Sequence, residues 1–395
     1  MASAQTPIVE YLEHIQRSVY LSLDRDPTWM HEDHESFMLD FVKQFYETHP
    51  PADGQDFDAF LKLARNTLLG NGDAGMSKYQ DPAWHDLLSQ LTSQIHKVLA
   101  ERGTDIAPRP IFGSLPTGRV NGMALKVPRS DDFLIIIEEG LFGFANLAAK
   151  AVSRVFPFKG TADGMLKFST DEKDVDDEFR RHPEICERYR ELLFAYLVGG
   201  HPHLATPYLP EKNYDTISSL LREAMELFVV GHEYGHLLCG HLESEGTKRA
   251  MLGNEAADEV ATNWHEEFEA DIRGLELMIA AMQNKGMDLS LSFWGADFFF
   301  GCIDSIERAV SILQTGAVAT QLSTTHPPTA MRREMLYTVL TNAVPEGAAE
   351  GPLSLARTVQ SILDRLWDSC EPYLLHAHAS GVELAPAWRT DHAAE

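Results

Sequence analysis

Cysteine is scarce in this 395-residue chain: it occurs only at positions 186, 239, 302 and 370, with no Cys-x-x-Cys pair among the four. A disulfide framework or a thiolate zinc cluster needs cysteines at characteristic spacings. We therefore expect free thiols, which are typical of a reducing, cytoplasmic environment.

Basic residues are also in short supply, because 33 Lys and Arg stand against 59 Asp and Glu and leave a net charge of −26. Contacts with nucleic-acid phosphates require clustered Lys and Arg, so we expect no nucleic-acid partner. Anionic membrane surfaces are disfavoured for the same reason. In the simpler interpretation, the excess of negative charge keeps the protein soluble. In the alternative, it attracts basic substrates.

Long hydrophobic runs are absent, since no stretch approaches the roughly 18 apolar residues that a spanning helix needs. The first ten residues have no basic segment followed by an apolar one, which a secretory signal would show. We therefore expect neither a membrane span nor a secretory signal.

The strongest motif lies at residues 227–241, which read Leu-Phe-Val-Val-Gly-His-Glu-Tyr-Gly-His-Leu-Leu-Cys-Gly-His. Residues four apart share one face of a helix, so His232 and His236 can bind one ion. Glu233 is rotated by about 100° from His232, toward the edge of that site. A core helix that merely buries its histidines is the alternative, but polar rings are costly to bury without partners. The pattern predicts a metal site with an adjacent general base.

A third ligand is expected in residues 264–271, which read Trp-His-Glu-Glu-Phe-Glu-Ala-Asp. Glu267 and Asp271 are four residues apart, so one carboxylate can bind the ion while the other orients a histidine ligand through its second ring N–H. Glu266 and Glu269 compete for the ligand role, but neither has an acidic residue four positions later. We therefore predict Glu267 as the ligand and Asp271 as the orienting acceptor.

The predicted cofactor is one zinc ion per chain, bound by His232, His236 and Glu267. Two imidazoles and a carboxylate suit zinc. Three protein ligands leave a fourth position open for water, which is the catalytic pattern. Glu233 would accept the proton of that water.

These segments resemble the gluzincin metallopeptidases, in the branch of the CaaX prenyl proteases, the HtpX-like membrane proteases and the small minigluzincins. In that branch another histidine follows the His-Glu-x-x-His motif, as His241 does here. Residues 323–332, Ser-Thr-Thr-His-Pro-Pro-Thr-Ala-Met-Arg, match its Ser/Thr-His-Pro segment. Residues 120–127 and 132–141 match its upstream hairpin. The resemblance covers roughly residues 110–345.

The resemblance implies further roles outside the ligand set. His326 would stabilise the oxyanion of the tetrahedral intermediate, although a loop histidine before two prolines could equally be structural. Arg332 would anchor that loop through carboxylate contacts. Strand 133–138 would be the sheet edge that pairs with a peptide substrate. An interior strand is the equal alternative, because Leu-Ile-Ile-Ile shows no alternation.

The expected fold class is α+β and predominantly helical, with a zincin-like metallopeptidase core and a small β-sheet. At 395 residues the chain exceeds the usual single core. We expect an N-terminal helical subdomain at 1–105, a catalytic domain at 106–345 and a C-terminal helix and tail at 346–395. An insertion at about 156–214 departs from the family and would form either a lid or a surface addition.

Hydrophobic spacing predicts the individual elements. We expect helices over 8–23, 36–46, 57–69, 84–101, 141–155, 176–197, 215–243 (N-capped by Asp215 or Thr216), 254–283, 289–313, 329–340 and 353–367. The aromatic-rich helix 289–313 is expected in the core. Strands are expected over 110–114, 120–127 and 133–138.

The predicted function is zinc-dependent hydrolysis of peptide bonds in a peptide or protein substrate. The alternative is a metal-binding regulatory or interaction protein on the same scaffold, with little or no turnover. An intact Glu233 favours the enzyme. The oligomeric state is left open.

Overall fold

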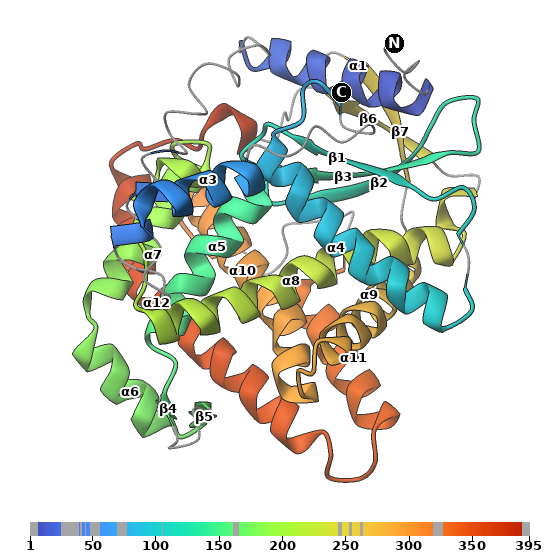
Figure 1. The fold of residues 1–395 in the computed structure, drawn as a ribbon. Helices are drawn as coiled ribbons and strands as arrows, with labels where there is room; N and C mark the ends of the chain where they lie inside the picture. The colour runs from blue at the N-terminus through green and yellow to red at the C-terminus, as the bar shows by residue number, and fades with distance from the viewer. Residues whose placement is uncertain are drawn as a thin grey trace. The chain divides into compact units, whose positions relative to one another are not determined.

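This computed structural model describes residues 7–24, 39, 42–43, 45–47, 56–68, 77–104, 106–160, 166–243, 247–252, 255–260, 264–318 and 327–388. It is predominantly helical with a small sheet (Figure 1). This confirms the predicted α+β, mainly helical class. The α-helices are α1 Pro7–Ser22, α3 Phe57–Leu68, α4 Pro82–Glu101, α5 Glu139–Arg154, α6 Glu172–Arg181, α7 Glu184–Leu197, α8 Lys212–Leu238, α9 Trp264–Asn284, α10 Leu289–Thr315, α11 Thr329–Ala343 and α12 Glu350–Ala379. The strands are β1 Ile111–Leu115, β2 Gly122–Lys126, β3 Phe133–Glu138, β4 Phe158–Gly160, β5 Leu166–Phe168, β6 Thr247–Leu252 and β7 Glu255–Val260.

The chain forms two compact units, and each is discontinuous in sequence. The first unit consists of Met1–Thr117, Asn121–Glu139 and His236–Ala261. The second consists of Gly118–Val120, Gly140–Gly235 and Thr262–Glu395. Helix α8 runs from the second unit into the first without a break in its backbone. The predicted segment boundaries at residues 105 and 345 remain a prediction.

The first unit contains a five-stranded sheet with the order β1-β3-β2-β7-β6. Strand β3 pairs with β1 in parallel and with β2 in antiparallel orientation, so it has a neighbour on each side. The prediction that 133–138 forms the substrate-pairing edge is therefore wrong, and the interior alternative is confirmed. Leu134 to Ile137 are fully buried on both faces of the strand, which explains their lack of alternation.

Helix α1 packs on this sheet through the apolar face that its periodicity predicts. Leu12 and Ile15 join one buried cluster with Leu134 and Ile136 of β3. A Cβ atom on Gly113 of β1 would lie 2.6 Å from the Leu12 side chain, so a larger residue would fit here only if Leu12 moved. The helix is thus a structural part of the sheet unit.

Helix α10 is the centre of the second unit and packs against α7, α9, α11 and α12. Phe293, Trp294, Phe298 and Phe300 of this helix are fully buried. The prediction that 289–313 is a core helix is confirmed. Four other helices pack around it and bury its aromatic side chains.

Several predicted helix boundaries are wrong. The predicted helix 254–283 begins only at Trp264, because residues 255–260 form β7, which pairs with β6 and β2. The predicted helix 176–197 is two helices that break before Pro183, whose ring nitrogen cannot donate a hydrogen bond. Helix α8 begins at Lys212, so neither Asp215 nor Thr216 is its N-cap.

Two further predictions concern membrane-spanning helices and the state of the cysteines. Within the described ranges, no helix combines the length and apolar character needed to cross a membrane. All four cysteines lie in these ranges and are free thiols, as their spacing predicts.

Helices α8 and α10 approach so closely that Gly295 cannot carry a side chain. A Cβ atom there would lie 2.4 Å from the Ala224 carbonyl carbon and 2.6 Å from the Met225 nitrogen. The atoms in the way are backbone atoms, so the helices themselves would have to separate.

We predict that Gly295→Ala lowers the free energy of unfolding by about 1–3 kcal/mol through this overpacking. Gly143→Ala in α5 is the matched control, because its Cβ atom would meet Pro202 at an ordinary 3.5 Å. It should be neutral or stabilising by up to about 1 kcal/mol, since alanine favours helices. Urea denaturation of both variants checks the difference, and equal effects would contradict it.

Helix α8 also buries a carboxyl group, that of Glu226, which is 2% exposed. Its Oε1 lies 3.6 Å from Arg222 Nε and accepts no hydrogen bond from the described residues. Burial raises the pKa of Glu226 to about 7, and the nearby Arg222 only partly opposes this. The folded protein therefore holds a proton here that the unfolded chain releases at lower pH.

Because the folded-state pKa is raised, the stability linked to Glu226 is complete below about pH 4.5 and is lost as the pH rises through about 7. We predict that Glu226→Gln removes a pH-dependent loss of about 1–3 kcal/mol between pH 5 and pH 8. Denaturation curves at both pH values measure this change. Glu276→Gln in α9, where a partly exposed carboxylate pairs with Arg273, should keep the wild-type slope.

Candidate metal site

The candidate site depends on the close approach of α8 and α9, which three glycines allow. A Cβ atom on Gly274 of α9 would lie 2.8 Å from the backbone nitrogen of His232. A Cβ atom on Gly235 of α8 would lie 2.8 Å from the Cα atom of Ala270. Gly231 is similarly close to Gly274, at 3.1 Å. The two backbones are therefore in contact at the level of the first predicted ligand.

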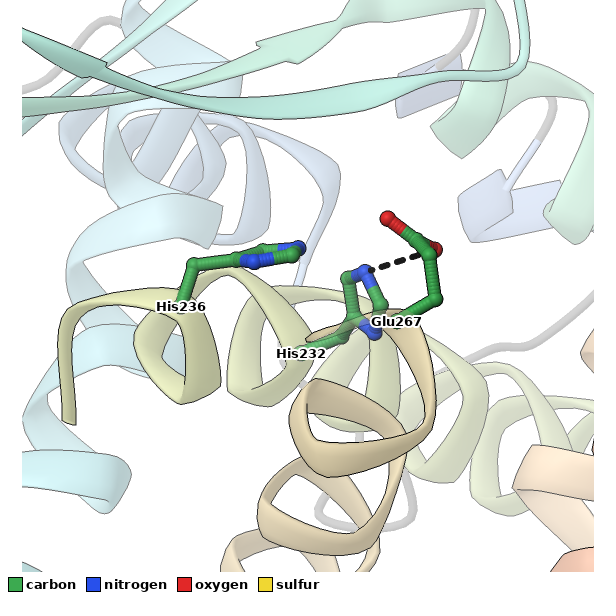
Figure 2. Close-up of side chains that lie close together, drawn as sticks. All are labelled: His232, His236 and Glu267. Carbon is green, nitrogen blue, oxygen red and sulfur yellow. Dashed lines mark ion pairs between the residues drawn. The ribbon is translucent and has the colours of Figure 1, made fainter. Parts of the chain in front are cut away.

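His232, His236 and Glu267 form a group that could hold a metal ion, with one ligand atom from each within 4.8 Å of the others. Figure 2 shows the three side chains pointing toward one another from α8 and α9. His232 Nε2 lies 3.8 Å from Glu267 Oε2, the pair joined by the dashed line. The structure thus brings together the three ligands predicted from the sequence.

Asp271 lies where it was predicted, behind His232. Its Oδ1 is 2.9 Å from His232 Nδ1, which leaves Nε2 on the side of Glu267. Burial lowers the pKa of His232, but the hydrogen bond and the charge of Asp271 outweigh it and raise that pKa above its usual value. The ring is thereby held in one orientation by a charged acceptor.

His236 has a different partner, His241, whose Nδ1 lies 2.9 Å from His236 Nδ1. Both residues are 5% exposed. The sequence motif includes His241, but sequence reasoning gave it no role. Its position just after Gly240, where helix α8 has ended, is the signal that could have pointed to one.

Arg332 pairs with both buried carboxylates of α9. Its Nε and Nη2 donate to the two oxygens of Asp271 at 2.7 and 2.6 Å, and Nη2 lies 3.2 Å from Glu267 Oε2. Burial raises the pKa of Asp271, but Arg332 and His232 outweigh it and hold that pKa below its usual value. Arg332 was expected to anchor the loop of His326 through carboxylates, and these are its carboxylate partners. His326 itself lies outside the described residues.

The competing carboxylates differ from Glu267 in their surroundings. Glu267 is 1% exposed, whereas the side chain of Glu269 is 43% exposed and lies 3.6 Å from His265 Nε2. Glu266 is partly exposed. Neither belongs to the ligand group found among the described residues.

Glu233, the predicted general base, is 5% exposed on α8 between the two histidines. Its negative charge contributes to the raised pKa of both His232 and Arg332. The Glu233 carboxylate is therefore close enough to His232 and Arg332 to interact with them electrostatically.

The donor set fits a divalent ion. Two atoms that bind one zinc ion at about 2.1 Å can be no more than about 4.2 Å apart. The 3.8 Å between His232 Nε2 and Glu267 Oε2 meets this limit, and the 4.8 Å span of the group needs only a small side-chain movement. Each imidazole has its Nδ1 beside another partner, so Nε2 is the nitrogen available to an ion.

No family model, curated protein or solved structure matches this chain. The likeness to the gluzincins thus depends on the motifs alone.

Arg332 and Arg333 offer a matched test of the charge balance, because each pairs with a fully buried aspartate, Asp271 and Asp297 respectively. We predict that Arg332→Met and Arg333→Met each lower the free energy of unfolding of chelator-treated protein by about 3–5 kcal/mol. Added Zn²⁺ should restore more stability to the Arg332 variant than to wild type, because the ion replaces the missing positive charge.

The zinc-dependent gain in the Arg333 variant should equal that of wild type, since Asp297 is outside the ligand group. Urea denaturation with chelator and with Zn²⁺ measures both gains. The same gain in all three proteins would show that Arg332 does not balance the site's charge.

Proposed function

We propose that this protein is a zinc-dependent metallopeptidase that hydrolyses peptide bonds. The observation that carries the proposal is the convergence of His232, His236 and Glu267, with Glu233 buried beside them. An ion held by these three ligands would polarise a carbonyl oxygen and lower the pKa of a water molecule.

The chain's own residues supply the rest of the chemistry. The carboxylate of Glu233 accepts the proton of the attacking water and later delivers it to the leaving amine. Asp271 accepts the Nδ1 proton of His232 and so favours the tautomer whose Nε2 lone pair faces the ion. Arg332 balances the charge of Asp271 and Glu267, which allows two carboxylates to stay ionised in a buried place.

The motif resemblance to the gluzincins supports the same reaction and adds one role. By that resemblance His326 would stabilise the oxyanion, a step that needs a hydrogen-bonding or positive group. This role remains a prediction.

A metal-binding interaction protein with little turnover is the alternative. Such a protein needs the three ligands but has no use for Glu233, and a buried carboxylate without a function is costly to keep. The position of Glu233 therefore favours the enzyme.

We predict that Glu233→Gln lowers peptide hydrolysis by about 10²–10⁴-fold, because the general base is lost while the ligands remain. Glu223→Gln is the control on the same helix, where the carboxylate pairs with Lys285. It should hydrolyse peptides at the wild-type rate. Digestion of a broad peptide library, with and without chelator, measures activity, and metal analysis confirms that each variant binds one zinc ion.

The outcomes separate the alternatives. Wild-type protein that binds zinc but cleaves no peptide would support the interaction protein. Cleavage that survives in Glu233→Gln would exclude the proposed mechanism.

A further inference from the structure

We propose that His241 is a positioning residue that sets the orientation and the tautomer of the ligand His236. The inference rests on the proposed metal site and goes beyond its ligands. It follows from the 2.9 Å contact between the two Nδ1 atoms, which joins two buried rings.

The contact allows only one arrangement of protons if His236 binds an ion. Two ring nitrogens form a hydrogen bond when one carries a proton and the other has a lone pair. The ligand His236 must keep its Nε2 lone pair for the ion, so its proton is on Nδ1 and is donated to His241. His241 accepts with Nδ1 and carries its own proton on Nε2.

This acceptor is neutral, in contrast to Asp271 behind the other histidine ligand. The charges of Glu233, Glu267 and Asp271 already act on His232, and Arg332 pairs with Glu267 and Asp271. A further carboxylate behind His236 would add a fourth buried negative charge to this group, at a desolvation cost. An imidazole provides the acceptor without that charge.

The backbone explains how His241 reaches His236. On a continuous helix, residues five apart are rotated by about 140° and do not face each other. Helix α8 ends at Leu238, and Gly240 adopts φ +73°, a left-handed conformation that glycine favours at helix ends. The chain then turns into the short helix His241–Glu243. The rings meet with centroids 5.1 Å apart and planes at 67°.

The first test compares His241→Phe with His241→Asn. Phenylalanine keeps a ring but has no acceptor, whereas the asparagine side-chain oxygen can accept from His236. We expect His241→Phe to bind Zn²⁺ about 10–100-fold more weakly, as is usual for losing such a partner, and His241→Asn to stay within about threefold of wild type. Competition with a chromophoric chelator measures affinity, and the Co²⁺ absorption spectrum reports the coordination.

The second test moves His241 without changing it, and remains decisive if His241→Phe does not fold. Gly240→Ala strains a left-handed position that has open space around it, so only the turn is affected. Gly286→Ala is the matched control, with φ +81° and equally open space beyond the end of α9. We expect both to lower Tm by a similar amount, and only Gly240→Ala to weaken Zn²⁺ binding.

Each outcome has a distinct meaning. Wild-type protein that binds no zinc would overturn the metal site and the proposed function together. Wild-type affinity in His241→Phe, or equal losses in the Phe and Asn variants, would overturn the role of His241 alone. If His241→Phe does not fold, equal affinities in the two glycine variants would do the same.

Discussion

The burial of two carboxylates one turn apart on α9 is the constraint on which the site depends. Glu267 and Asp271 are almost completely excluded from solvent, and an isolated charge in such a place is prohibitively costly. Arg332 contacts both, and His232 lies against both. The four side chains form a charge network that is satisfied only when α8, α9 and α11 are packed together.

The same packing gives the network its geometry. Gly235 and Gly274 remove the side chains that would separate α8 from α9, and each faces backbone atoms of the opposite helix. Close backbone contact between the helices sets the positions of His232 and Glu267 relative to each other. A site on such elements is better preorganised than one built from loops. Helix packing and candidate chemistry therefore have one physical origin.

Much of the helical architecture could be predicted from hydrophobic spacing, because amphipathic periodicity reflects which face is buried. The failures have specific causes. Residues 255–260 read as part of an acidic helix, yet they pair with β6 and β2, so strand pairing between distant segments overrides the local pattern. An apolar run such as 134–137 cannot show whether its strand is at the edge or in the interior, since both faces are buried either way.

The sequence by itself determined which donors meet on one helix face, because the four-residue spacing of His232 and His236 and of Glu267 and Asp271 is a property of local geometry. Only the tertiary structure decided which groups from outside these two helices hold them in place. Arg332 lies 61 residues from Asp271 in sequence. His241 reaches His236 only because the backbone reverses at Gly240. Such partners depend on how segments pack and turn, and spacing along the chain carries no record of that.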